Sequence, residues 1–529
     1  MKLAFLKKVR IILSLLFFVF NLFVFIDFTG ILGAKVIQSI LYLQFFPSLL
    51  EFLKTALIAS AGFLFILAVT LLFGRVYCSS VCPLGTIMDI STRLSLKMCR
   101  KPKFRYRKHL WIPRFGILAV AILLLVLNNL FILNLLDPFG ISGRIFSGLF
   151  RPAWYTGNNL LAGFLKIFDN YTLYPVPVKF ISLSSVLVSL LFLAAIVVPA
   201  VFRGRWYCNV ICPVGSLLGL FSRFSLFRLQ IDRSRCTACG ICTNKCKAEC
   251  IDFKKYKIDF SRCIACYNCI GDCPEGGINY DLRFGGKRKE EKIPVPQSES
   301  IARDPVTGIQ NRRDFFKTGI AGAAGLALAQ TGFSKAGTQG VSMKPVTPPG
   351  SVSIWNYTAK CVSCNLCVSI CPTRVLQPTI AEFGMTGLFQ PKMDFHTNFC
   401  NFECVICTEI CPTGAILPVT KEQKETLQIG ISKFIKNICI VVEKKTTCGA
   451  CSEHCPTKAV EMVPYLGELK IPAVNEKICV GCGACEYACP TKPDKAIYVE
   501  SNLYHRKAMK PLKKIEDKEE KKQIEDFPF

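Results

Sequence analysis

The sequence predicts a membrane α-helical bundle joined to small α+β domains of the bacterial ferredoxin type. Two observations lead to this fold class. Hydrophobic residues make up 51% of the 529-residue chain, and the long apolar stretches lie mostly before residue 233. Thirty cysteines are present, and most of those after residue 233 occur in groups of four with short, regular gaps. This spacing, usually closed by proline, is the ligand pattern of bacterial [4Fe-4S] ferredoxins.

The membrane domain is predicted to occupy residues 1–233. About 20 apolar residues are needed to cross a bilayer, and four stretches of about this length lack the polar face of a globular helix. These predicted spans are residues 11–28, 52–73, 115–136 and 180–202. Lysine and arginine are concentrated at the N-terminus and between residues 93 and 108. Because such residues mark the cytoplasmic side, both ends of the bundle are expected to face the cytoplasm.

A motif occurs twice in this domain, as GRVYCSSVCPLG from Gly74 and as GRWYCNVICPVG from Gly204. Each copy contains a CxxxCP pair of cysteines. The pairs are Cys78 with Cys82 and Cys208 with Cys212. Cysteines at positions i and i+4 share a helix face, so the two pairs could meet as one four-thiol site. We predict a redox or metal-binding role for them. Four thiols suit zinc and iron alike, and the alternative is a role in packing alone.

Haem is not expected in this chain. None of its four histidines lies in a predicted span, so the bundle lacks a histidine pair for a b-type haem. A CxxCH sequence for covalent haem attachment is also absent. Any electron transfer would therefore depend on iron and sulfur, or on a cofactor that belongs to a partner.

Residues 234–284 are predicted to form a cytoplasmic ferredoxin domain with two clusters. The fourth cysteine of each group in such domains binds the other cluster. The clusters are therefore assigned to Cys236, Cys239, Cys242 and Cys273, and to Cys263, Cys266, Cys269 and Cys246. A zinc ribbon would need only two CxxC pairs. Lys247 stands where proline usually follows the fourth cysteine, and Cys250 is left over.

The middle of the chain is predicted to carry an export signal. After a polar linker, residues 285–310, the segment 311–335 has Arg312 and Arg313 ahead of an apolar run rich in glycine and alanine. This resembles a twin-arginine signal, although Asn311 and Phe316 replace the usual serine and leucine. The segment would be cleaved or would remain as a fifth, anchoring helix. A second linker is expected at residues 336–354.

Residues 355–500 are predicted to form a ferredoxin-like domain with four more clusters. All four cysteine groups end in Cys-Pro, and two have extra residues in the first gap. The predicted ligands are Cys361, Cys364, Cys367, Cys371, Cys400, Cys404, Cys407, Cys411, Cys439, Cys448, Cys451, Cys455, Cys479, Cys482, Cys485 and Cys489. Adjacent groups are expected to exchange fourth ligands, with the pairing of groups left open. Residues 501–529 are expected to form a solvated, charged tail.

The positive charge of the chain is not taken as a sign of nucleic-acid binding. The formal net charge is +28, but a cluster with four thiolates carries about −2, so six clusters would remove about 12 charges. Much of the remainder lies in loops beside the predicted spans, where it sets orientation. No basic stripe alternates with base-stacking aromatic residues, and no nucleic-acid partner is expected.

These motifs resemble two families of ferredoxins. Residues 1–284, with four spans, two CxxxCP pairs and a two-cluster domain, are similar to the NapH-type membrane ferredoxins of periplasmic nitrate reductase systems. Residues 311–500, with a twin-arginine signal and four clusters, are similar to the NapG/MauM type. The chain therefore resembles a fusion of the two. NosR-type regulators share the CxxxCP pairs, but the flavin-binding domain that usually accompanies them is not found here.

The resemblance implies the electron-transfer component of a quinol dehydrogenase in the inner membrane. Quinol would be oxidised in the bundle, and six [4Fe-4S] clusters would pass the electrons to a periplasmic reductase or carrier. The C-terminal domain would then lie in the periplasm, and the CxxxCP cysteines would link quinol to the clusters. Two other functions stay open. They are a maturation factor that keeps a partner metalloenzyme reduced or loaded, and an electron-input module that runs from a cytoplasmic donor to quinone.

Overall fold

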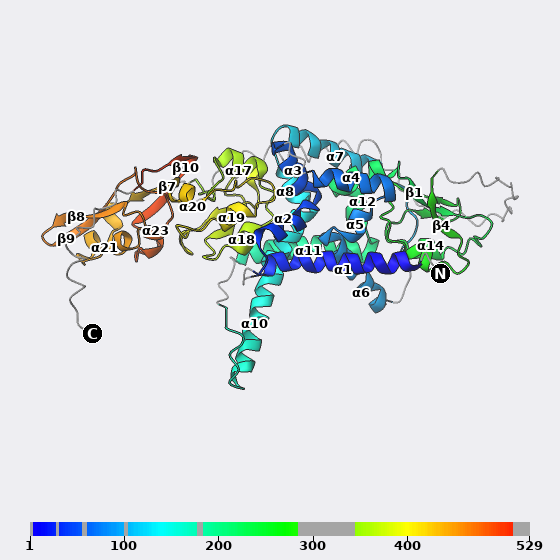
Figure 1. Cartoon of the computed structure of the whole chain (residues 1–529), viewed down its shortest axis with the longest axis horizontal. Helices are drawn as coiled ribbons and strands as arrows, with labels where there is room; N and C mark the ends of the chain where they lie inside the picture. Colours follow the sequence, from blue (N-terminus) through cyan, green and yellow to red (C-terminus); the bar gives the residue numbers. More distant parts are fainter. Residues whose placement is uncertain are drawn as a thin grey trace, which may run out of the picture. The chain divides into compact units, whose positions relative to one another are not determined.

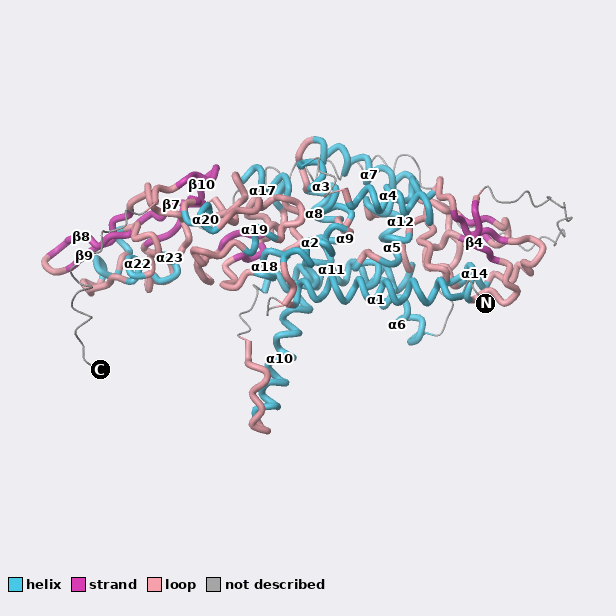
Figure 2. The backbone as a smooth tube through the Cα atoms, in the orientation of Figure 1, coloured by secondary structure: helices cyan, strands magenta, loops and turns pink. Residues whose placement is uncertain are grey.

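The computed structural model describes residues 4–27, 31–55, 61–99, 104–176, 183–283 and 344–510 (Figure 1). The predicted twin-arginine segment, residues 311–335, lies outside these ranges. Within them, a helical bundle is followed by one ferredoxin domain and then by a larger, C-terminal ferredoxin-like domain. Figure 2 shows that the strands belong to these two ferredoxin domains.

Two helices in the described part of the chain are long and apolar enough to cross a membrane. They are α1 (Ala4–Ile26) and α11 (Leu183–Arg203). A third candidate is the bent pair α2 (Ala34–Tyr42) and α3 (Phe45–Thr55), whose axes meet at 99°. The membrane helices are thus observed in part, and the full set of four spans stays a prediction.

The second predicted span lies partly outside the described residues, and the third is interrupted. α3 ends at Thr55, and α4 (Gly62–Phe73) begins beyond residues that are not described. α7 (Trp111–Val126) ends at a turn where Asn128 has a φ of 55°, and α8 (Phe131–Leu136) follows. The Asn129 side chain accepts a hydrogen bond from the Phe131 amide at 2.9 Å and so starts α8. Hydropathy does not detect this break, because the turn lies inside an apolar run.

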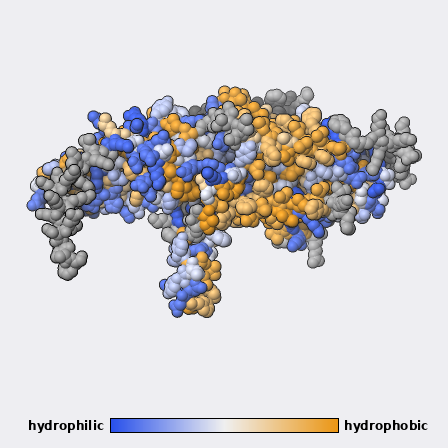
Figure 3. All heavy atoms as spheres, in the orientation of Figure 1, coloured by the Kyte–Doolittle hydropathy of each residue, from blue (hydrophilic) through white to orange (hydrophobic). Residues whose placement is uncertain are grey.

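Apolar side chains cover the outer surface of the bundle. Ile12, Leu123 and Leu191 are 63%, 58% and 69% exposed, and Figure 3 shows apolar residues gathered over these helices. Soluble monomers rarely expose large contiguous apolar patches. This surface therefore fits a lipid environment.

A long helical run follows α8 where the sequence suggested only a connection. Three elements are continuous: α9 (Pro138–Ile145), the π-helical turn η2 (Phe146–Phe150) and α10 (Arg151–Lys166). The Asp137 carboxylate accepts a hydrogen bond from the Gly140 amide at 2.7 Å, and Pro138 takes the first helical position. Both features favour a helix start, so the local sequence encodes the beginning of this run.

Each copy of the repeated motif forms a short helix followed by a longer one. The elements are α5 (Val76–Ser80) and α6 (Pro83–Cys99) in the first copy, and α12 (Trp206–Val210) and α13 (Pro213–Ser222) in the second. Gly74 and Gly204 precede the short helices with φ values of 83° and 57°, a conformation that glycine adopts without strain. The sequence repeat is therefore also a structural repeat.

The first ferredoxin domain has two small antiparallel sheets. Its elements are β1 (Phe227–Ile231), α14 (Ile241–Asn244), β2 (Ile251–Asp252), β3 (Lys257–Ile258), α15 (Asn268–Gly271) and β4 (Ile278–Leu282). β1 pairs with β4, with Leu229 opposite Tyr280, and β2 pairs with β3. The two short helices lie within the two cysteine groups and carry their third cysteines, Cys242 and Cys269.

The C-terminal domain contains three two-stranded sheets, β5–β6, β7–β10 and β8–β9. Its elements are α17 (Ile354–Lys360), α18 (Leu366–Ile370), β5 (Leu376–Pro378), η4 (Met385–Gly387), β6 (Pro391–Met393), α19 (Ile406–Glu409), α20 (Lys421–Glu425), β7 (Leu427–Phe434), η5 (Lys436–Ile438), α21 (Ile440–Glu443), α22 (Ala450–Glu453), β8 (Val460–Leu466), β9 (Leu469–Val474), α23 (Ala484–Ala488) and β10 (Ile497–Lys507). β10 pairs with β7 as far as Lys507, beyond residue 500, where the sequence placed the start of the solvated tail. Val346 already bridges to Met393, so the fold also begins before residue 355.

Candidate iron–sulfur centres and the four-thiol site

The first ferredoxin domain brings together both expected sets of cysteines. One set lines a small cavity: Cys236, Cys239, Cys242 and Cys273. The thiols of the other set lie close enough to influence one another's charge, and we call such groups electrostatic neighbours. They are Cys246, Cys263, Cys266 and Cys269. Each set therefore takes one member from the other half of the domain.

Cys250, left unassigned by the sequence, lies beside the second set. Its Sγ is 3.6 Å from the Sγ of Cys246, and it also contacts Cys263. Hydrogen bonds to cluster sulfurs help to set reduction potentials. Cys250 is thus a candidate for tuning this cluster, which its position outside the regular spacing did not indicate.

The four cysteine groups with standard spacing share one backbone conformation. Positive φ angles occur at equivalent positions: Ala238 and Gly240, Ala265 and Tyr267, Ser363 and Asn365, and Gly481 and Gly483. Residues other than glycine rarely adopt such angles, so the loop shape is imposed by the site. In this shape the amide of Leu366 donates to Cys364 and that of Ala484 donates to Cys482. The loops therefore point backbone donors at the ligand sulfurs.

In the C-terminal domain the first cysteine group pairs with the second, and the third with the fourth. The four sets are Cys361, Cys364 and Cys367 with Cys411; Cys400, Cys404 and Cys407 with Cys371; Cys439, Cys448 and Cys451 with Cys489; and Cys479, Cys482 and Cys485 with Cys455. The two halves meet where the Cys400 amide donates to the Cys482 carbonyl at 2.9 Å. The four sets thus form a connected series.

The chemistry of these sets fits four-iron clusters. Among the residues that the structure describes, no group of three or more His, Cys, Asp or Glu side chains is placed around a single metal ion. The ligands of a four-iron cluster bind different irons and so enclose a larger volume. Burial raises the pKa of Cys361 to about 12 and that of Cys451 to about 11. These thiols therefore keep their protons at neutral pH until iron displaces them.

The two CxxxCP pairs meet inside the bundle. Cys78 and Cys208 are each 5% exposed, and Cys82 and Cys212 are 6% and 4% exposed. Burial raises the pKa of Cys82, and the nearby Cys208 and Cys78 raise it further. The other three cysteines are all electrostatic neighbours of Cys212. The four-thiol site suggested by the repeat is therefore present as an arrangement of side chains.

Two arginines of the motif exchange contacts between the copies. Arg75 donates to the Cys208 carbonyl at 3.0 Å, and its Nη2 lies 3.7 Å from the Sγ of Cys78. Arg205 donates to the Cys78 carbonyl at 2.9 Å, and its Nη1 lies 3.9 Å from the Sγ of Cys208.

The last glycine of each motif copy makes room for this exchange. A Cβ at Gly85 would lie 2.6 Å from Arg205, and one at Gly215 would lie 2.8 Å from Arg75. The sequence analysis did not assign roles to these arginines and glycines, although their presence in both copies was a signal.

A buried charge cluster joins the four-thiol site to the first ferredoxin domain. Asp89 pairs with Arg10 at 2.8 Å, with Arg205 at 2.8 Å and with Lys247 at 3.2 Å. Although burial raises it, these three cations hold the pKa of Asp89 well below its usual range. Arg10 and Lys247 are also electrostatic neighbours of Cys266. The lysine that replaces the usual proline thus belongs to this connection.

On another side, the four-thiol site approaches the C-terminal domain. Tyr207 is an electrostatic neighbour of Cys208 and Cys212. Arg144 has both Tyr207 and Cys364 among its own neighbours. The four-thiol site is therefore linked by these contacts to both ferredoxin domains.

Arg144 is an unusual cation within this second connection. It is 2% exposed, and its guanidinium nitrogens have no hydrogen-bond partner among the described residues. The guanidinium lies over the rings of Phe192 and Phe389, at 4.4 and 5.2 Å. Cys364 packs closely here, because a Cβ at Gly143 would lie 2.1 Å from its carbonyl oxygen. The Asp137 carboxyl is its strongest electrostatic partner, and an anionic cluster bound at Cys364 would compensate the buried charge further.

Three protein-family models match the chain. A "4Fe-4S binding domain" model matches residues 55–104 and 185–232, which include both CxxxCP pairs. A "4Fe-4S dicluster domain" model matches residues 446–492, and a further "4Fe-4S binding domain" model matches residues 357–377. The prediction of iron–sulfur domains is thereby confirmed, whereas the number of six clusters stays a prediction.

Several proteins are similar to parts of the chain. A ferredoxin-type protein NapH of Haemophilus influenzae is 25% identical over 37% of this chain and 55% of its own length. The methylamine utilization ferredoxin-type protein MauN of Paracoccus denitrificans is 29% identical over 33% and 48%. An uncharacterized protein of Methanocaldococcus jannaschii is 25% identical over 40% and 69%.

The chain spans about half the length of the NapH and MauN proteins. No solved structure matches it significantly. The similar proteins, the family models and the cysteine groups agree on an iron–sulfur electron-transfer protein of the membrane.

Proposed function

We propose that this chain carries electrons from the quinol pool to an acceptor on the exported side of the membrane, through six [4Fe-4S] clusters and the four-thiol site. The observation that carries the proposal is the position of the four-thiol site, which is linked to Cys266 by Arg10 and Lys247 and to Cys364 by Arg144. The clusters supply one-electron steps when bound. The protein sets their spacing and their potentials through burial and hydrogen bonds to sulfur.

The contacts of α1 support placing the two ferredoxin domains on opposite sides of the membrane. Near its start, Lys7 pairs with Asp272 of the first ferredoxin domain at 3.0 Å. Near its end, Val24 lines a cavity together with Ile370 and Ile410 of the C-terminal domain. A helix of 23 residues is about 35 Å long, and the apolar core of a bilayer is about 30 Å thick. With the N-terminus inside, the C-terminal domain faces the periplasm.

At the four-thiol site we favour an anionic metal centre over a pair of thiols that cycles with a disulfide. Arg10, Arg205 and Lys247 share one carboxylate, Asp89, so two positive charges remain. Arg75 adds a third, because its hydrogen bonds go to uncharged groups. Buried charges need compensation. A disulfide is neutral, whereas four thiolates around iron keep a net negative charge.

The same geometry favours a second candidate, an electron-input module that starts from a cytoplasmic donor. A route from quinol to the periplasm alone would not need the first ferredoxin domain. The contacts of Lys247 and Arg10 with Cys266 nevertheless connect that domain to the four-thiol site. Electrons from a cytoplasmic donor could enter there and pass through the four-thiol site to quinone.

Cluster reduction in anaerobic membrane vesicles separates the two candidates. Under the proposal, added menaquinol reduces clusters of the C-terminal domain, which electron paramagnetic resonance detects. Under the second candidate, menaquinol leaves the clusters oxidised, and reduced methyl viologen supplied on the cytoplasmic side reduces them.

Sidedness is tested by reporter fusions. A phosphatase fused near Pro345 should be active and one fused near Lys289 inactive, and lysines in place of Arg312 and Arg313 should block export. Cytoplasmic signals from both fusions would contradict transfer to the periplasm.

A further inference from the structure

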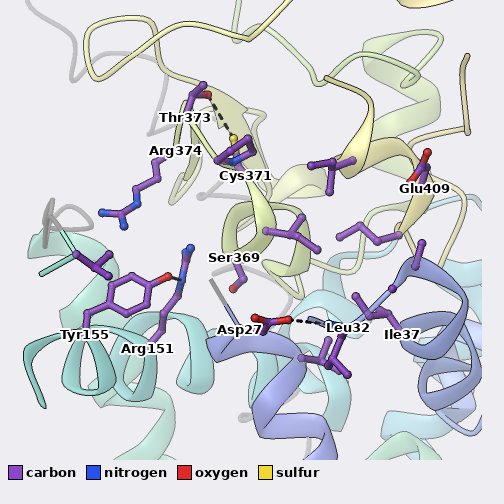
Figure 4. A pocket seen from close by; sticks show the side chains of 18 of the residues that line it. Asp27, Leu32, Ile37, Arg151, Tyr155, Ser369, Cys371, Thr373, Arg374 and Glu409 are labelled. Carbon is purple, nitrogen blue, oxygen red and sulfur yellow. Dashed lines mark hydrogen bonds between the residues drawn. The ribbon is translucent and has the colours of Figure 1, made fainter. Parts of the chain in front are cut away.

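A cavity of about 750 Å³ lies between the bundle and the C-terminal domain (Figure 4). It is bordered by residues from α1, α2 and α10 and by the segment around Cys371. Val24, Ile37, Ile370 and Ile410 form apolar parts of its wall. Ligand pockets commonly measure about 300–1,000 Å³, so the cavity can hold a small organic molecule.

Polar groups are present at a few places in this apolar wall. Asp27 follows the end of α1, and its Oδ2 accepts a hydrogen bond from the Leu32 amide at 3.0 Å. The Nε of Arg151 donates to the Tyr155 hydroxyl at 2.8 Å. Figure 4 shows these side chains around one space. A carboxylate, a guanidinium and a phenol thus line the cavity, which suits a ligand with two polar ends and an apolar body.

The cavity also touches a predicted cluster. Cys371 and Pro372 line it, and Cys371 is the fourth member of the set that contains Cys400 and Cys407. A molecule bound in the cavity would therefore lie beside an electron acceptor. This combination of an apolar cavity, a carboxylate and a redox centre is what a lipid-soluble carrier of electrons and protons requires.

We propose that this cavity is the quinol site. The inference rests on the proposed function and adds the place at which quinol binds and gives up its protons. The Tyr155 hydroxyl, which Arg151 orients, donates a hydrogen bond to one ring oxygen, and Asp27 accepts a proton from the other hydroxyl. One quinol and two oxidised clusters give one quinone, two reduced clusters and two protons, of which Asp27 takes the first and water the second.

A phospholipid headgroup is the competing ligand, because it would come from the same membrane. Arg151 is already directed to the Tyr155 hydroxyl and, at 3.2 Å, to the Val368 carbonyl. The Asp27 carboxylate in the same cavity would repel a phosphate. Arg374 and Glu409 also line the cavity, so its two guanidinium groups and two carboxylates balance in charge. A neutral diol can donate a hydrogen bond to the Asp27 carboxylate and adds no net charge, so the cavity favours quinol.

Blocking the cavity tests the proposal on the full-length holoprotein in detergent. Ala34 lines the cavity, so Ala34→Trp should fill it. Val36 lies on the same helix, is 47% exposed and does not line the cavity, so Val36→Trp is the matched control. Binding of the quinol analogue 2-heptyl-4-hydroxyquinoline N-oxide is measured by fluorescence quenching. It should weaken by about tenfold or more in Ala34→Trp and stay unchanged in Val36→Trp, with equal iron content in both.

A second variant tests the proton acceptor. Asp27→Asn should still bind the analogue, whereas its clusters should be reduced by decylubiquinol about a hundredfold more slowly, a typical loss for a missing base. Wild-type rates in Asp27→Asn would overturn this role.

The outcomes separate this inference from the proposed function. If the wild-type protein neither binds the analogue nor accepts electrons from quinol, the proposed function fails. If it does both and Ala34→Trp does so equally well, the proposed function stands and the cavity is not the quinol site. Loss of a copurifying phospholipid from Ala34→Trp, with quinol reduction unchanged, would assign the cavity to lipid and overturn the inference.

Discussion

The ferredoxin domains and the four-thiol site hold their cysteines by different means. In the ferredoxin domains a short loop places three cysteines and directs its own amides to them, as Leu366 does to Cys364. In the four-thiol site the Gly215 amide donates to the Sγ of Cys212 at 3.4 Å, and arginine side chains add further donors. Arg75 donates to the Cys208 carbonyl in a motif copy 133 residues away. A ferredoxin set is therefore largely encoded within its loop. The four-thiol site exists only when both motif copies pack together.

The two kinds of site also differ in charge. Backbone amides are dipoles and need no counterion, whereas buried guanidinium groups do. Arg205 is fully buried, and its pairing with Asp89 draws Arg10 and Lys247 into the same cluster. The four-thiol site should therefore depend on charged residues from distant segments for its assembly, and this dependence can be tested.

The largest expected effect comes from breaking the four-thiol site itself. Cys78→Ser or Cys208→Ser should abolish electron transfer between the first ferredoxin domain and the C-terminal domain, which the four-thiol site links, while the spectra of six clusters remain. With a four-iron centre at this site, iron should fall from about 28 to about 24 per chain. Cys99→Ser is the control, because Cys99 lies outside the motif and outside the tetrads. A normal rate of this electron transfer in the Cys78 and Cys208 variants would show that the two CxxxCP pairs have a structural role only.

A smaller effect should follow from removing the shared carboxylate. Asp89→Asn leaves buried cations without a partner, which typically costs about 3–5 kcal/mol of unfolding free energy. Asp272→Asn is the matched control, because Asp272 also pairs with a cation of α1, Lys7, but both side chains are about 30% exposed. An exposed pair contributes about 0–1 kcal/mol. Thermal unfolding in detergent compares the two, and equal losses would contradict the buried charge cluster.

The cysteine sets could be predicted from the sequence because their geometry is local. A gap of two residues brings two thiols to one cluster, and the exchange of fourth ligands follows a general rule. The repeated CxxxCP pairs were also visible, since i and i+4 positions share a helix face. For the four C-terminal groups the sequence favoured exchange between adjacent groups, as observed, but it left open which groups pair, because that depends on how whole loops pack.

Other features depend on contacts between distant segments and left little sign in the sequence. The break at Asn128 lies in an apolar run, and the cavity near Asp27 forms only where α1, α10 and the C-terminal domain meet. Lys247 and Cys250 appeared as departures from the ferredoxin pattern, and the structure gives both of them partners. Departures from a motif were thus the available signal for longer-range contacts.

The smallest predicted effect concerns the pH dependence of stability. It arises from His505, a buried base of the C-terminal domain, which changes protonation in a pH range where Asp89 does not. Burial lowers the pKa of His505 to about 4, while its Nε2 lies 2.9 Å from the Thr347 hydroxyl. An unfolded histidine has a pKa of about 6.5, so the unfolded state binds a proton first as the pH falls. The stability linked to neutral His505 is fully present above pH 6.5 or so and is lost as the pH falls toward 4.

After a discount for the partial exposure of His505, the free energy of unfolding of the wild type should fall by about 1–2 kcal/mol more than that of His505→Gln between pH 7 and 5. Glutamine can keep a hydrogen bond to Thr347 without titrating, and Asp89 stays charged throughout this range. Unfolding at both pH values measures the difference, and parallel losses in the two proteins would mean that His505 does not titrate there.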